Sequence, residues 1–303
     1  MNRTRLKVAE RPATPTCPQH GMALIVVLWM VVLLSIMATG HSRNAHTDTR
    51  LASRQVEIAQ ARALAEAGIN HVVLEMLTDN AERELAVDGS VFTIDILGDV
   101  ATLAIRDATG LVDLNAASPD LLAATLSACG VGGAQQRALV DAILDWRDAD
   151  DLKHLNGIED DDYLAAGLPW TSRDAAFQSI DELRYLPGMS QPLYERLEAL
   201  VTVHSHRAGL NLEFAPPILI AALTGDEVQP ATQQAVSDST RQQRRGIRNG
   251  TYHIYATAAG GSGTIATIEA VVNISPSSEQ PFRVLDWRDP ARHALRPPQG
   301  ATS

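Results

Sequence analysis

The chain has 303 residues and a formal net charge of −11. This length leaves room for two domains, and the acidic excess argues against nucleic acid as a partner of the folded part. The two cysteines are Cys17 and Cys129. Because Cys17 lies in a candidate leader segment, we expect no disulfide in the folded part and interpret Cys129 as a small buried apolar residue.

An uncharged run covers residues 22–40, MALIVVLWMVVLLSIMATG. A helix of this length spans about 28 Å, close to the hydrocarbon thickness of a bilayer. The residues ahead of it are mainly basic: Arg3, Arg5, Lys7 and Arg11. The sequence therefore predicts a single-pass membrane protein, with residues 1–20 in the cytoplasm and the main domain across the membrane. The alternative is a removed signal peptide, but its apolar core would usually be shorter.

Beyond this run the pattern stays helical, with no proline between Met22 and Asp79. Apolar residues recur at spacings of 3 and 4, which is the period of one helix face. They are Ile58, Ala61, Ala65, Ile69, Val72 and Met76. We expect one continuous helix over residues 22–80 that offers this stripe to a partner helix.

Strand signals follow the helix and return near the end of the chain. Short segments with alternating apolar and polar side chains are bounded by turn residues. They are residues 90–96, 101–107, 250–258, 263–274 and 281–287. The segment 226–248 is either a helix or a connection, and residues 290–303 have the composition of a disordered tail.

Residues 108–207, between the two groups of strands, carry helical patterns instead. The sequence thus predicts an α+β fold in which the long helix packs on an antiparallel sheet. Residues 81–107 and 208–289 form the α/β unit, and an all-helical domain is inserted between them.

The helical domain resembles helix-hairpin-helix or SAM-like repeats. The segment VDLNAASP at 112–119, followed by an apolar helix start, has an echo in LNLEFAPP at 210–217, and a Leu-Pro-Gly-Met turn follows at 186–189. Such units often bind DNA phosphates through cations. From Asp107 to Gly209, however, there are 17 acidic and 7 basic residues, a net charge of −10. We therefore expect no DNA binding and interpret the repeat as a scaffold.

Carboxylates concentrate between Asp145 and Asp162. Oxygen ligands crowded on a loop suit Ca²⁺. Counted from Asp148, the loop departs from an EF-hand because Leu152 and Lys153 stand where an oxygen ligand and a glycine belong. A solvated charge run is the alternative, although like charges on one loop repel and a divalent cation would relieve that repulsion.

The leader ends in Gly21, directly before the apolar run. A short basic leader ending in glycine, followed by such a helix, resembles a type IV prepilin or pseudopilin. This resemblance implies that a prepilin peptidase cuts after Gly21 and methylates Met22. Most pilins have Glu as the fifth mature residue, where this chain has Val26. Because a carboxylate in lipid is kept only where it has a role, its absence disfavours a repeating major subunit.

Further motifs follow in a fixed order: DLNAAS at 113–118, ILDWRDADD at 143–151, NGIEDDDY at 156–163, SIDELRYLPGM at 179–189, and a final Trp287-Arg288. Together with the start of the chain, they resemble the general secretion pathway protein K family along nearly the whole mature chain. This resemblance implies a minor pseudopilin at the tip of the periplasmic pseudopilus of the type II secretion system, anchored in the bacterial inner membrane.

The same resemblance implies partners and a cofactor. The partners are minor pseudopilins I and J and, more loosely, H. The cofactor is Ca²⁺ in the helical domain. Its candidate ligands in this chain are Asp148, Asp150, Asp151, Glu159, Asp160 and Asp161.

Other functions fit the residues less well. Asp145 and Asp181 could act as an acid–base pair, but nothing in the sequence places them in one cleft, and we expect no catalytic residues. A type IV pilus minor pilin or a membrane-anchored adhesin would share the long helix and the sheet. Neither has a reason to carry the inserted helical domain and its acidic loop.

Overall fold

The structure is a computed structural model that describes residues 20–78, 85–225, 249–261 and 263–289. The side chains of residues 20–23 and 38–50 are outside this description. Residues 1–19 of the predicted leader, the segment 226–248 and the tail 290–303 therefore lie outside the described residues, as do the side chains of Gly21 and Met22.

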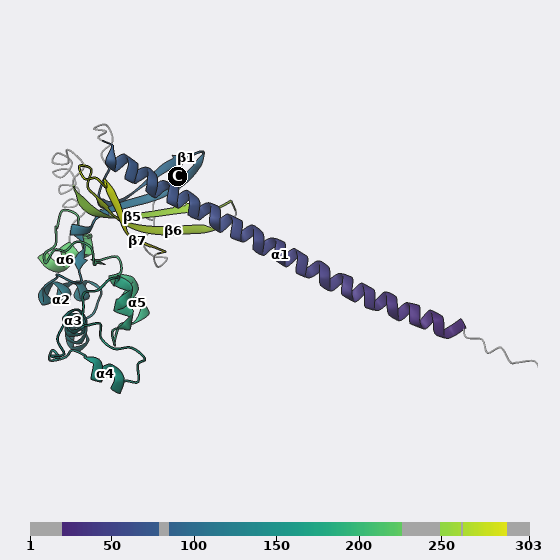
Figure 1. Cartoon of the computed structure of the whole chain (residues 1–303), viewed down its shortest axis with the longest axis horizontal. Coiled ribbons are helices and arrows are strands. Elements are labelled where there is room, and N and C mark those ends of the chain that lie inside the picture. Colours follow the sequence, from purple (N-terminus) through teal and green to yellow (C-terminus); the bar gives the residue numbers. More distant parts are fainter. Residues whose placement is uncertain (1–19, 79–84, 226–248, 262, 290–303) are drawn as a thin grey trace, which may run out of the picture. The chain divides into compact units, whose positions relative to one another are not determined.

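The predicted long helix is confirmed as α1 (His20–Leu77), one helix of 58 residues (Figure 1). It runs through two units of the chain, residues 1–56 and 57–303. In the first unit, the side chains of residues 24–37 are exposed and, apart from Ser35, apolar. No helix within the described residues combines the length and the hydropathy that a membrane span requires.

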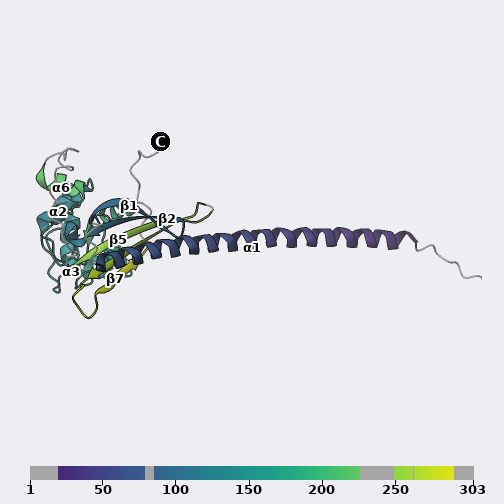
Figure 2. The ribbon, with the colours of Figure 1, turned by 90° about the horizontal axis from the view of Figure 1, so that it is seen from above.

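The second unit contains a five-stranded antiparallel sheet with the order β1-β2-β5-β6-β7. All five predicted strands are present within two residues of their expected ends. They are β1 (Asp88–Ile96), β2 (Asp99–Asp107), β5 (Gly250–Ala259), β6 (Ile265–Ile274) and β7 (Phe282–Arg288). In Figure 2 the strands lie along the C-terminal part of α1. The α+β class predicted from the sequence is confirmed.

The apolar stripe of α1 packs on this sheet. Ala65, Ile69 and Val72 are at most 1% exposed and share one core with strand residues such as Leu103 and Ile254. A Cβ atom on Gly68 would lie 3.3 Å from Leu103 Cδ2, so a glycine lets the helix approach the sheet closely.

The expectation that this stripe meets a partner helix is therefore wrong for most of it. Ala61, Ala65, Ile69, Val72 and Met76 are all buried, and only Ile58 is exposed. The physical reason is that an amphipathic face buries against the nearest apolar surface, which is the chain's own sheet.

The helical domain is inserted between β2 and β5. In it, the short strands β3 (Val112–Asp113) and β4 (Val201–Thr202) pair in parallel. Its elements are η1 (Ala108–Gly110), β3 (Val112–Asp113), α2 (Pro119–Ala128), α3 (Gly133–Arg147), α4 (Asp160–Ala165), η2 (Ile180–Tyr185), α5 (Gln191–Leu197), β4 (Val201–Thr202) and α6 (Pro217–Thr224).

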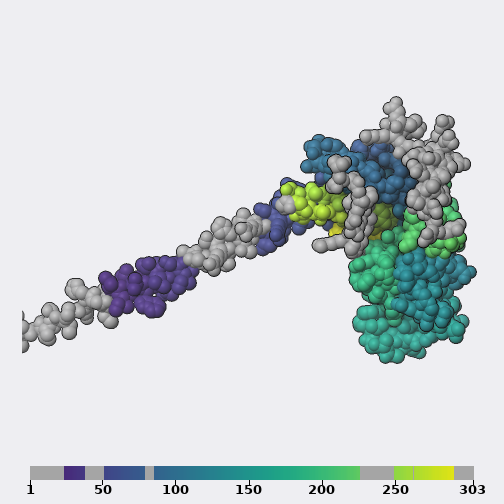
Figure 3. All heavy atoms as spheres, turned by 180° about the vertical axis from the view of Figure 1, so that it is seen from behind, coloured from purple at the N-terminus to yellow at the C-terminus, as the bar shows by residue number. Residues whose placement is uncertain are grey.

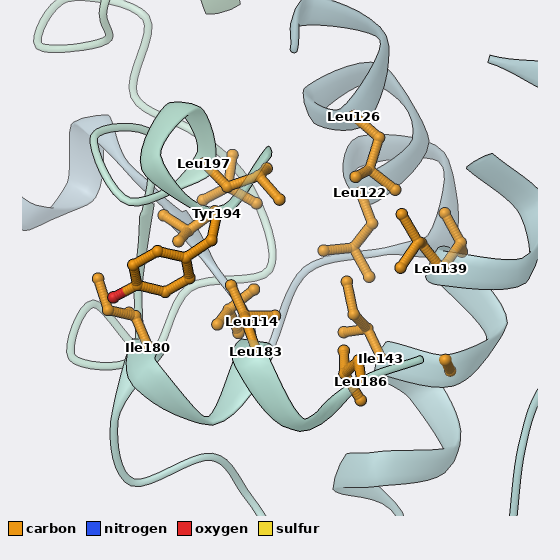
Figure 4. Close-up of a cluster of buried hydrophobic side chains, with 14 of the residues drawn as sticks. Leu114, Leu122, Leu126, Leu139, Ile143, Ile180, Leu183, Leu186, Tyr194 and Leu197 are labelled. Carbon is orange, nitrogen blue, oxygen red and sulfur yellow. The ribbon is translucent and has the colours of Figure 1, made fainter. Parts of the chain in front are cut away.

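The helical domain has its own core. Side chains of α2, α3, η2 and α5 gather in one cluster, with Leu122, Leu126 and Leu139 on one side and Tyr194 on the other (Figure 4). Cys129 is buried in the same core, as expected. Leu219 of α6 is fully buried in this core too. In Figure 3 the domain appears as a separate mass of teal and green atoms beside the yellow strands. Ser118 begins α2 as expected, because its hydroxyl accepts a hydrogen bond from the amide of Leu121.

Candidate cation site in the helical domain

The concentrated carboxylates lie around the loop that joins α3 to α4. The loop folds over Asp145, a fully buried residue of α3. The carboxylate of Asp145 accepts hydrogen bonds from the amides of His154 at 3.1 Å and Ile158 at 2.7 Å, and it contacts the imidazole Nδ1 of His154. A Cβ atom on Gly157 would lie 1.8 Å from Asp145 Oδ2, so only glycine fits there.

Asp148 lies beside this buried carboxylate. Ligand atoms of Asp145, Asp148 and His154 all lie within 4.8 Å of one another. Within the described residues, Asp148 Oδ1 is buried and has no hydrogen-bond partner. Burial, and then the charge of Asp150, raise the pKa of Asp148 above its usual value. An unpaired buried carboxylate oxygen of this kind is costly in the absence of a cation.

Glu159, at the start of α4, likewise has a buried carboxylate oxygen without a hydrogen-bond partner among the described residues. The residue is 7% exposed, and the oxygen in question is Oε1. Burial, followed by the charge of Asp145, raises the pKa of Glu159 to about 7. The phenolic oxygen of Tyr163, whose ring is fully buried, is likewise without a partner among these residues.

Ser172 brings further oxygens to the same place. Its hydroxyl oxygen lies 3.3 Å from Glu159 Oε2 and 3.2 Å from Asp160 Oδ1, and it also contacts Asp174 Oδ1. A hydroxyl carries one proton and can donate it to one carboxylate at a time. The other carboxylate oxygens therefore face its lone pairs, an arrangement that a bound cation would stabilise.

The six predicted ligands fall into two groups. Asp148 and Glu159 each have a buried oxygen, and Asp160, although exposed, lies beside the hydroxyl of Ser172. Asp150, Asp151 and Asp161 are exposed, and Asp150 accepts a hydrogen bond from the amide of Leu152 at 2.9 Å. The assignment of calcium ligands stays a prediction for all six.

Asp145, His154, Ser172 and Asp174 were not among the predicted ligands. The sequence does point to Asp145 as a further ligand candidate, because it lies three residues before Asp148 and residues at this spacing share a helix face. No sequence pattern points to Ser172 and Asp174, since only the folded chain brings them beside α4. Asp145 also has no acid–base partner in Asp181, whose carboxylate instead accepts a hydrogen bond from the hydroxyl of Tyr194 at 2.6 Å.

The donor set suits a hard divalent cation. Unpaired oxygens of Asp148 and Glu159 lie buried near Asp145, and Asp160 and Asp174 add more oxygens nearby. Ca²⁺ accepts about six to eight oxygen ligands in flexible geometry, whereas the imidazole of His154 would suit a transition metal better.

Comparison with known proteins agrees with this architecture. Residues 99–206, which include most of the helical domain, match the family model of type II secretion system (T2SS), protein K. Residues 20–70 match a model described as PilX N-terminal.

The relatives found by sequence comparison are also described as type II secretion system protein K. Type II secretion system protein K of Pseudomonas aeruginosa is 26% identical over 244 residues, which is 73% of this chain and 72% of the relative. The protein of Aeromonas hydrophila is 28% identical over 246 residues, 71% of this chain and 74% of the relative. The match to the putative protein K of Escherichia coli K12 is 27% identical and spans 62% of that protein's length.

A solved structure shares the fold. It is a chain in the GspK-GspI-GspJ complex from the type 2 secretion system of enterotoxigenic Escherichia coli, with a TM-score of 0.53 and 19% identity. The match covers 79% of this chain and 98% of that chain. Family model, relatives and fold agree that the chain is similar to type II secretion system protein K.

Proposed function

We propose that this chain is a minor pseudopilin that caps the tip of the periplasmic pseudopilus and supports protein export across the outer membrane. The observation that carries the proposal is the family match over residues 99–206, because that region includes most of the inserted helical domain. An insertion of this size would prevent stacking within a filament but is compatible with its tip. The role is structural and involves neither catalysis nor nucleic acid.

A secretion assay tests this role. In a type II secretion strain that lacks its own protein K, the wild-type chain should restore export of a reporter exoprotein. A variant in which a short linker replaces the helical domain should restore less, although it is made and inserted in equal amount. Equal export by both would contradict a tip role for the domain. A type IV pilus minor pilin, the alternative suggested by the helix and sheet, would instead support piliation in a pilus strain.

Membrane anchoring belongs to the same proposal. Residues 22–40 would span the inner membrane with the main domain in the periplasm, after prepilin peptidase cuts between Gly21 and Met22. Substituting Gly21→Trp should leave an unprocessed precursor in the membrane fraction, seen as a larger band on a gel. Normal processing of this variant would rule out the leader assignment.

For pseudopilins I and J, and more loosely H, we propose contact with the outer side of α1. In the second unit this side exposes Ala59, Ala63, Asn70 and Leu74, whereas the opposite side is buried on the sheet. The support is that the structural relative was solved in a complex named for GspK, GspI and GspJ.

Co-expression with pseudopilins I and J tests this surface. Ala63→Glu places a charge at its centre and should lower recovery of the complex at least about tenfold, as expected for a buried unpaired charge. Ala259→Glu, on an exposed strand end of the sheet, is the matched control and should leave recovery unchanged. Equal recovery of both variants would place the interface elsewhere.

Calcium is the cofactor we propose for the acidic loop. Asp145, Asp148, Glu159 and Asp160 would supply the oxygens, and Ca²⁺ would offset their mutual repulsion. A cation that binds only the folded chain raises its melting temperature. The chain in detergent should therefore melt higher in millimolar CaCl₂ than in EGTA. A shift with ZnCl₂ or MnCl₂ but none with CaCl₂ would assign the site to a transition metal held through His154.

A further inference from the structure

A buried polar network connects the helical domain to the sheet. His253 of β5 is 1% exposed and bonds in two directions. Its Nδ1 lies 2.7 Å from Glu269 Oε1 on the neighbouring strand β6, and its Nε2 lies 3.0 Å from Thr202 Oγ1. Thr202 belongs to β4 of the helical domain, so this imidazole bridges the two domains.

A neutral tautomer of His253 satisfies the bridge. Thr202 Oγ1 accepts a hydrogen bond from the amide of His204 at 3.1 Å. Its own proton can therefore be donated to His253 Nε2, while the proton on His253 Nδ1 is donated to Glu269. In this tautomer every polar atom of the bridge has a partner.

Arg288, near the end of β7, completes the network. Its Nε lies 2.8 Å and its Nη2 2.6 Å from Glu269 Oε2. Burial opposes the charge of Arg288, but the negative charges of Glu269 and, after it, Glu198 raise its pKa above the usual value. Glu198 is a buried residue that caps α5, so Arg288 is attracted to carboxylates of both domains.

The network lies on the side of the sheet away from α1. Along β5, Tyr252 and Ile254 belong to the core under α1, and side chains alternate between the two faces of a strand. His253 therefore points to the opposite face. Glu269 pairs directly across the strands with Arg288, which places all three groups on the face where Thr202 reaches them.

The two domains also meet at a second place, where the chain enters and leaves the helical domain. A Cβ atom on Gly110 would lie 2.3 Å from the carbonyl oxygen of Phe214, so the two connecting segments touch there. Arg106 donates a hydrogen bond to the same carbonyl oxygen at 3.0 Å. One point of contact leaves a domain free to pivot, and a second removes that freedom.

We propose that the network of Thr202, His253, Glu269 and Arg288 is an orientation lock: it holds the helical domain at one fixed angle on the sheet, while the Gly110–Phe214 contact is the pivot. Buried polar networks restrict a structure to one geometry more than they add to its stability. The lock also gives a role to the Trp-Arg ending of the sequence, since Arg288 closes it. For a tip protein, a fixed angle presents the helical domain in one direction.

Distance measurement between spin labels tests the lock in the full chain in detergent. With Cys17 and Cys129 replaced by Ser, labels on Ala165→Cys in the helical domain and Ala259→Cys in the sheet report the angle, because both sites are exposed. Thr202→Val removes only the hydroxyl of the bridge. The distance distribution should become at least twofold broader, while the circular dichroism spectrum is unchanged.

Two matched variants separate a lock from a general loss of packing. Thr202→Ser keeps the hydroxyl and should restore the narrow distribution. Thr257→Val removes a threonine hydroxyl that bonds Thr267 within the sheet at 3.1 Å, and it should leave the distribution narrow. If Thr202→Val does not fold, Arg288→Lys replaces it with the same expectation, because lysine cannot bind Glu269 through two nitrogens. A narrow distribution in the folded variant would overturn the proposal.

Discussion

Two buried glutamates of this chain have opposite environments. Glu269 in the sheet has both oxygens bonded, to His253 and Arg288. The hydrogen bond from His253 and the positive charge of Arg288 hold the pKa of Glu269 below the usual value, although burial alone would raise it. Glu159 in the helical domain has an unpaired oxygen and a pKa raised to about 7, chiefly by burial. The difference teaches that the pKa of a buried carboxylate is lowered or raised according to whether a positively charged side chain is paired with it.

Removal of the internal counter-ion should have the largest effect. Arg288→Met leaves the buried Glu269 without its guanidinium partner, with only the hydrogen bonds of His253 and Tyr255, and we expect a loss of about 3–5 kcal/mol in the free energy of unfolding. Thermal or urea unfolding of the full chain in detergent measures it. Arg283→Met, on the same strand but exposed, is the control and should change little. Similar effects from both would mean that Glu269 is not paired as described.

The pairing of Glu269 with Arg288 predicts that the free energy of unfolding depends on pH. The folded pKa of Glu269 is lowered from 4.5, so its stabilising contribution is fully present above that pH and is lost as the pH falls through the lowered value. The difference in stability between the wild-type chain and Glu269→Gln should therefore shrink in acid. A difference that stays constant from neutral pH to pH 3 would contradict the pairing with His253 and Arg288.

Steric crowding at the acidic loop should have an intermediate effect. In Gly157→Ala the added Cβ atom would meet Asp145 Oδ2, so the loop must move, at a cost of about 1–3 kcal/mol. Gly209→Ala is the control, because nothing lies within 4 Å of a Cβ atom there. Equal melting temperatures for the two variants would show that the loop does not depend on close packing against Asp145.

Neutralisation of Glu159 should have the smallest effect and the opposite sign. In EGTA, Glu159→Gln should raise the stability of the folded chain by on the order of 1 kcal/mol, because it removes a buried charge that has no counter-ion. The corresponding change at Glu269 should lower stability. If both substitutions destabilised the chain in EGTA, the contrast between the two glutamates would be lost.

Much of the fold follows from local pattern. The alternation in residues 250–258 and 263–274 and the 3.6-residue period of α1 predict their elements, because burial of one face imposes the period. The pattern shows which side chains are buried but not what covers them. For this reason the stripe with Ala65 and Val72 was assigned to a partner helix although it packs on the chain's own sheet.

The candidate site was predictable only where its residues are close in sequence. The run from Asp148 to Asp161 signalled a cation through its crowded carboxylates. Ser172 and Asp174 join it through a turn after α4 that no spacing rule predicts. Likewise, the pairing of Thr202 with His253 connects residues 51 apart and depends on how the helical domain meets the sheet.

Calcium titration by calorimetry is the most direct test of the claim that the acidic loop takes its counter-ion from solution. The full chain in detergent, stripped with EGTA and returned to chelator-free buffer, should bind Ca²⁺ with measurable heat. A variant with both Asp148→Asn and Glu159→Gln should bind at least about tenfold more weakly, a difference of roughly 1.4 kcal/mol. Absence of binding to the wild-type chain at millimolar Ca²⁺, or equal binding by the variant, would contradict the account.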